Sequence, residues 1–267
     1  MGFTDLIQQL RQSASREIIA PSTWTQGRAV FGGLVAGLLY EGMRLELDAE
    51  RLLRSFSISF VGPVAADVPL RVDVRVLREG RAVTQVQAHG IQNDEVMAVA
   101  LASFGLARES TLHIEAQEPA PLVAPPESAA ERLVKEGLMP QFARFYDLRW
   151  SIGGQPFSGT SEREMGGWMR YTDPQPEMAE AQLLGLIDAW PPAVLPMLTG
   201  DQLGPVSSLT WAVDFLHPLP ALSSTDWLLY RAVVEHARDG YNQAHAHIWS
   251  QTGELIALSR QTVAVFV

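Results

Sequence analysis

The sequence contains no cysteine among its 267 residues. Disulfides, thiolate nucleophiles and cysteine-ligated zinc or iron–sulfur sites are therefore excluded. The absence is also compatible with a reducing compartment.

Lysine is almost absent as well, because Lys135 is the only one and the other basic residues are arginines. The net charge of -10 disfavours a general surface for nucleic acid or anionic membrane. A local arginine site for a phosphate group stays open, since guanidinium groups bind phosphate in a bidentate manner.

Long apolar runs are missing too. The longest are well short of the roughly 20 residues that a membrane-spanning helix needs. The first residues, Met1–Asp5, open an amphipathic stretch rather than a charged segment followed by an apolar run, so we expect no signal peptide. The sequence predicts a cytoplasmic protein without a membrane or nucleic-acid partner.

What the chain does contain is one pattern that occurs twice: an apolar helix followed by several strands. The helices are predicted at Phe31–Met43, which is rich in glycine, and at Ala179–Ala189. A further short helix is predicted between the halves, near Ala130–Glu136. Strands are predicted at Arg54–Val61, Leu70–Leu77, Ala82–Ile91 and Val96–Leu106 in the first half, and at Ala143–Ile152, Gly167–Thr172, Ser208–Phe215, Trp227–Glu235, Tyr241–Ser250 and Leu255–Val267 in the second.

The two halves can be aligned with each other. Ser59–Pro63 corresponds to Asp214–Pro218, and Asp94–Ala98 corresponds to Gly253–Ala257. A repeat of this length indicates two similar units. Between them lies Glu115–Ala130, rich in Pro, Ala and Glu, which is typical of a linker.

We therefore predict an α+β fold in which each unit is an antiparallel sheet wrapped around one helix. The predicted boundaries are a first unit at 1–110, a linker at 111–140 and a second unit at 141–267.

Three segments carry a resemblance to a known family. They are Val30–Gly33, Trp227–Tyr230, and Gly253–Ala257 followed by Gln261. With the repeat, the chain resembles the double hot-dog acyl-CoA thioesterases of the bacterial thioesterase II type. The resemblance implies two tandem hot-dog domains, an acyl-CoA substrate hydrolysed to the free acid and CoA, no cofactor, and a homo-oligomer.

In that family an Asp, a Thr or Ser, and a Gln of the second hot-dog domain hold a water molecule. The resemblance places the Gln at Gln261, whose counterpart in the first half is Ala102. It places the Asp at Thr210. The hydroxyl residue falls near Glu235–Ala237, where none occurs.

Residue chemistry adds the remaining candidates. Asp188 is a carboxylate in an apolar helix, where burial would raise its pKa toward that of a useful base, although it could also simply cap the helix. Gln261 and Thr210 could orient water, and Asp214 shares a strand face with Thr210. We assign substrate binding to Gly32 and Gly33, because backbone N–H groups at a helix N-terminus can polarise a thioester carbonyl. The alternative for these glycines is helix packing alone.

No metal site is expected. His245 and His247 alternate with apolar residues and have no evident third ligand. We expect their side chains on a solvent-facing or subunit-facing surface.

Other functions stay open at this point. A hot-dog hydratase would need a His paired with an acid near the central helix, and neither helix has one. A double hot-dog protein that binds acyl-CoA without turnover is the main alternative, and it predicts no thiol release. A purely structural protein is the third possibility.

Overall fold

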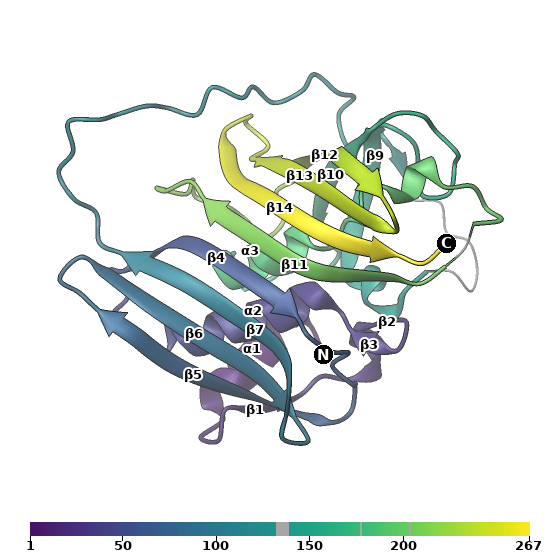
Figure 1. Cartoon of the computed structure of the whole chain (residues 1–267). Coiled ribbons are helices and arrows are strands. Elements are labelled where there is room, and N and C mark those ends of the chain that lie inside the picture. Colours follow the sequence, from purple (N-terminus) through teal and green to yellow (C-terminus); the bar gives the residue numbers. More distant parts are fainter. Residues whose placement is uncertain (132–138, 177, 203) are drawn as a thin grey trace.

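The computed structural model describes residues 1–131, 139–176, 178–202 and 204–267. In this part of the chain, a 12-stranded antiparallel sheet forms the front layer and the α-helices lie behind it (Figure 1). Its strands are β1 (Glu17–Ile19), β4 (Leu52–Phe60), β5 (Pro69–Glu79), β6 (Val83–Gln92), β7 (Glu95–Gly105), β8 (Ala130–Glu131), β9 (Tyr146–Ile152), β10 (Glu164–Tyr171), β11 (Val206–Phe215), β12 (Leu228–Arg238), β13 (Tyr241–Trp249) and β14 (Leu255–Val265). The helices are α1 (Phe3–Gln12), α2 (Gly32–Arg44) and α3 (Glu180–Ile187), with short 3-10 turns η1 (Ser22–Trp24), η2 (Gln141–Phe145) and η3 (Leu195–Met197). A small second sheet pairs β2 (Thr25–Gln26) with β3 (Ala29–Val30).

The strand order has a centre at the β4–β11 pair. On one side it runs β4-β7-β6-β5-β1, and on the other β11-β14-β13-β12-β10-β9-β8. Phe60 pairs with Ala98 in the first half, as Phe215 pairs with Ala257 in the second. These pairs agree with the alignment of the two halves that the sequence suggested.

Helices α2 and α3 pack against each other beneath the sheet, which explains why α2 is apolar on nearly every face. Phe3 of α1 packs against both of them at a glycine. A Cβ at Gly37 would lie 2.6 Å from the Phe3 ring, and one at Gly185 would lie 2.4 Å from it. Glycine at these two positions therefore lets the three helices approach closely.

The connection between the halves crosses the surface as a long exposed segment without helix or strand, 106–129 (Figure 1). A short helix was predicted near Ala130–Glu136, but Ala130–Glu131 forms strand β8 instead, and the rest lies outside the described residues. Strand β8 pairs with β9 at the edge of the sheet.

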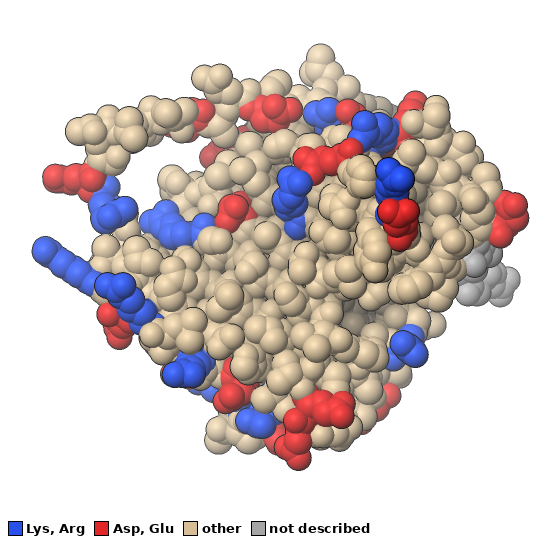
Figure 2. Space-filling view, viewed as in Figure 1, with Lys and Arg blue, Asp and Glu red and all other residues tan. Residues whose placement is uncertain are grey.

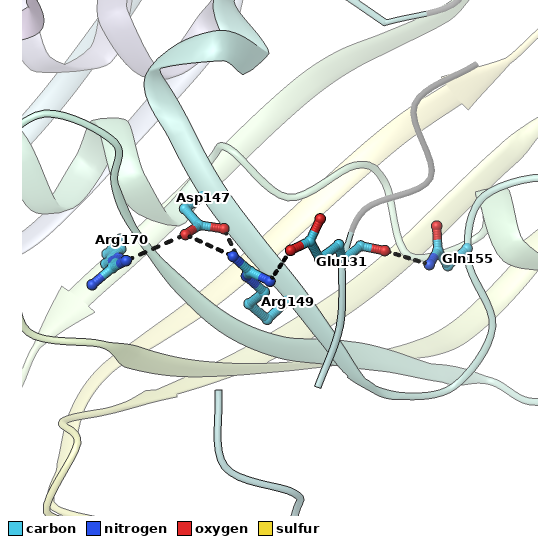
Figure 3. A network of polar contacts seen from close by, with 5 residues as sticks. All are labelled: Glu131, Asp147, Arg149, Gln155 and Arg170. Atoms are coloured by element: carbon cyan, nitrogen blue, oxygen red, sulfur yellow. Dashed lines mark hydrogen bonds and ion pairs between the residues drawn. The ribbon is translucent and has the colours of Figure 1, made fainter. Parts of the chain in front are cut away.

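A polar network holds that edge (Figure 3). The Arg149 guanidinium lies 2.6 Å from Glu131 of β8 and 2.9 Å from Asp147 of its own strand. Arg170 of β10 contacts Asp147 from the other side, and Gln155 donates to the Glu131 carbonyl at 3.0 Å. The ion pairs thus connect three strands at the point where the chain enters the second half.

Among the described helices, none is long and apolar enough to cross a bilayer. Charged side chains lie mostly around the rim of the visible face, while the middle of the sheet shows few of them (Figure 2).

Candidate active site

Asp188 lies where the two central helices meet. It is the C-cap residue of α3, and its carboxylate accepts a hydrogen bond from the backbone N–H of Gly33 in the first turn of α2. A Cβ at Gly32 would stand 2.9 Å from Asp188 Oδ2, and one at Gly33 would stand 2.9 Å from Asp188 Cβ. The positive end of the α2 dipole therefore faces this carboxylate.

Gln261 completes a polar cluster with Asp188. Its side-chain amide, from β14, donates to Asp188 Oδ1 at 3.4 Å and to Ser208 Oγ of β11 at 3.0 Å. The amide nitrogen of Gln261 is therefore occupied by Asp188 and Ser208. The amide oxygen is the atom that Gln261 can present to a water molecule.

A β-bulge explains why Ser208, and not Thr210, reaches this cluster. The β11–β14 register shifts between Ser208 and Thr210, so that Ser208 pairs with buried Val263, whereas Thr210 pairs with Thr262. Thr210 is exposed, and Asp214 on the same strand face is exposed too. The structure therefore does not bring Thr210 or Asp214 to Asp188.

The surroundings change the acidity of Asp188. Burial raises the pKa of its carboxyl from 3.8 to about 7, although the hydrogen bonds from Gly33 and Gln261 favour the charged form. A carboxyl with a pKa near neutrality can hold and release a proton under ordinary conditions. Such a strongly perturbed group, in contact with a helix N-terminus, is typical of an active site.

A narrow pocket opens beside Asp188. Its walls include Gln261, Ser259, Trp190, Trp211 and Tyr230. Trp211 donates its indole N–H to Ser259 Oγ at 2.8 Å, which fixes one wall. Burial, followed by the charge of Asp188, raises the pKa of the Tyr230 phenol above its usual range, so this phenol is neutral.

The first half does not repeat the polar cluster. The bulge on β4 falls between Leu53 and Ser55, so buried Leu53 takes the position of Ser208, and Ala102 takes that of Gln261. Near the N-terminus of α3, Tyr40 of α2 donates to Glu180 at 3.2 Å. His217 lies 3.8 Å from Glu180 and is not part of the wall of the Asp188 pocket.

Of the residues predicted from the sequence, Asp188, Gln261, Gly32 and Gly33 lie together, and Thr210 lies apart from them. Ser208 was not predicted. The positions near Glu235–Ala237, where the resemblance placed a hydroxyl residue, are exposed at the end of β12. The structure thus brings an Asp, a hydroxyl residue and a Gln together as Asp188, Ser208 and Gln261, and the first two do not lie at the positions to which the resemblance was carried over.

Comparisons with known proteins identify the family of the chain. Residues 20–105 match the family model of the acyl-CoA thioesterase N-terminal domain, and residues 117–265 match that of the C-terminal domain. The chain is 26% identical over 254 residues to acyl-CoA thioesterase 2 of Haemophilus influenzae, covering 88% of this chain and 86% of that protein.

Solved structures show the same fold. A hot-dog protein of unknown function from Alicyclobacillus acidocaldarius superimposes with a TM-score of 0.80 at 25% identity, covering 94% of this chain and 92% of that one. An acyl-CoA thioesterase II from Mycobacterium marinum gives a TM-score of 0.74 at 23% identity, with the same coverage. The predicted hot-dog fold is thereby confirmed, and the two domain matches show that the chain belongs to the acyl-CoA thioesterase family.

Proposed function

We propose that this enzyme hydrolyses an acyl-CoA thioester with a water molecule held by Asp188, Gln261 and Ser208. The observation that carries the proposal is the Gln261 amide, which donates to both Asp188 and Ser208 beside the first turn of α2. The cluster holds an acceptor for the water proton and groups that orient its oxygen. Both are requirements for attack on a carbonyl carbon.

Asp188 would act as the general base. With a pKa of about 7, its carboxylate takes a proton from water as the oxygen attacks the thioester carbon. The tetrahedral intermediate then collapses, the carbon–sulfur bond breaks, and the same proton reaches the departing CoA sulfur. One water is consumed, and the products are the free acid and CoA.

The N-terminus of α2 would hold the developing oxyanion. Gly33 donates its N–H to Asp188. Gly32 is the first residue of α2, where a helix N–H has no acceptor within the helix. That group can therefore donate to a thioester oxygen, and the helix dipole favours the negative charge there.

The finer organisation is also part of this proposal. We infer two tandem hot-dog units at 1–110 and 141–267, with 111–140 as the linker, supported by the matching strand pairs of the two halves.

We further infer a homo-oligomer. The sparsely charged middle of the visible face in Figure 2 supports an interface between copies. Leu101 also supports it, because it is 45% exposed on β7, the strand next to the central β4–β11 pair.

A thiol-release assay tests the proposed function. Purified protein is mixed with acyl-CoAs of increasing chain length, and free CoA is followed with a thiol reagent. We expect release from at least one substrate. Binding of acyl-CoA without any thiol release would instead support the non-catalytic alternative.

Substitutions can show whether the hydroxyl of Ser208 or that of Thr210 contributes to catalysis. Ser208→Ala should lower kcat/KM by about three- to tenfold, because Gln261 loses one of its two hydrogen bonds. Ser208→Thr, which keeps a hydroxyl, should retain most of the activity. Thr210→Ala should change kcat/KM by less than about twofold, as expected for an exposed side chain. The reverse order of effects would return the role to Thr210.

A further inference from the structure

Aromatic rings form a large part of the wall of the pocket beside Asp188. Trp190 follows Asp188 by two residues, where the chain leaves α3, and its indole is buried. It stacks on Tyr230 of β12 with ring centroids 5.3 Å apart and planes 7° from parallel. Trp150 of β9 meets the same indole edge-on at 4.6 Å. Stacked and edge-to-face contacts of this kind favour a fixed wall.

Little space remains between this wall and the base. The pocket volume is about 10 Å³. That is close to the space of one water molecule. Ala244 and Ala246 of β13 also line it, and their small side chains leave the bulk of the aromatic rings as the obstacle.

The polarity of the pocket indicates which part of a thioester enters it. Apart from Asp188, Gln261, Ser259 and His245, whose ring contacts Glu235, its walls are aromatic or alkyl. An acyl chain suits such walls, whereas the charged phosphates of CoA would lose their hydration there. The acyl group therefore points inward past Asp188, toward Trp190.

We propose that the stacked pair of Trp190 and Tyr230 is the end wall of the acyl slot and restricts this enzyme to short-chain acyl groups. This inference rests on the proposed thioesterase function. It names the substrate class and assigns its selection to a pair of residues outside the hydrolytic cluster.

Trp190 is the residue on which to test the wall. In the described part of the chain, its buried indole N–H has no hydrogen-bond partner. The ring is therefore held by packing. A smaller apolar side chain would lengthen the slot without leaving another buried polar group unpaired.

The experiment compares kcat/KM for acetyl-, butanoyl-, octanoyl- and palmitoyl-CoA between the wild type and the variants Trp190→Leu and Trp190→Ala. We expect the wild type to favour acetyl- or butanoyl-CoA by about tenfold or more, since one methylene in a filled pocket already costs this much. Trp190→Leu should move the optimum to octanoyl-CoA, and Trp190→Ala should move it further. The leucine variant keeps the test valid if the alanine variant does not fold.

Trp249→Leu is the matched control. Trp249 is fully buried on β13 but does not line the pocket, and its N–H is bonded to the Glu118 carbonyl. We expect lower thermal stability and an unchanged chain-length optimum. Two results would contradict the proposed end wall. One is a wild-type preference for palmitoyl-CoA, and the other is a Trp190→Leu variant that keeps the wild-type chain-length optimum. Absence of thiol release from every substrate would instead refute the proposed function.

Discussion

Replacing Asp188 with Asn should lower kcat for thiol release by about a hundred- to ten-thousandfold, the range expected for loss of a general base. An amide cannot take the proton of the attacking water. It can still accept the hydrogen bond that Gly33 donates to the carboxylate. The substitution should therefore leave the helix junction intact, and substrate binding should persist. The measurement is single-turnover thiol release together with acyl-CoA binding.

The same group should set the pH dependence of the reaction. Because the pKa of Asp188 is raised to about 7, kcat/KM should fall as the pH decreases through 7, when the base gains its proton. The small residual activity of Asp188→Asn should lack this acidic limb of the pH–rate profile. A wild-type rate that stays constant from pH 8 to about pH 5 would contradict Asp188 as the base.

Stability should change in the opposite sense to activity. A carboxyl whose pKa is raised in the folded state binds its proton more tightly there than in the unfolded chain. Stability is thus greatest below the unfolded pKa of about 4 and is lost as the pH rises toward 7. The loss is at most about 4 kcal/mol, since one pKa unit corresponds to about 1.4 kcal/mol. Asp188→Asn should therefore melt at a higher temperature than the wild type at pH 8, and the gap should shrink at about pH 5.

The polar cluster could be read only partly from the sequence. Asp188 was identified because a carboxylate in an apolar helix is unfavourable unless it is paired or functional. Gln261 was identified by its spacing from Ala257. Ser208 gave no comparable signal. Its side chain reaches Gln261 because the bulge shifts the register by one residue. Alternation of side chains along a strand does not foresee such a shift.

More of the fold than of the site could be predicted from the sequence. The repeat predicted which strand positions are equivalent, and the pairs Phe60–Ala98 and Phe215–Ala257 agree with it. The closeness of Asp188 to Gly33 was not foreseeable in the same way. It depends on how α2 and α3 pack against each other, with Phe3 in contact with a glycine of each helix.

The contact between the two helices leads to the second large effect. Gly33→Ala should lower kcat/KM by about a hundredfold, because a small displacement of a catalytic group costs this much. A Cβ at this position would stand 2.6 Å from the Phe31 ring and 2.9 Å from Asp188 Cβ. The added methyl group therefore pushes Asp188 away from the N–H that now holds it.

The pH profile of this variant distinguishes displacement of the base from general damage to the fold. The hydrogen bond from Gly33 favours the charged carboxylate, so losing it should move the limb of the pH–rate profile above pH 7. Gly42→Ala is the control, because its Cβ would stand 2.5 Å from Val72 at the far end of α2. It should reduce the melting temperature and leave the limb in place. If Gly33→Ala also leaves the limb at pH 7, the N-terminus of α2 serves packing alone, and the oxyanion must be held elsewhere.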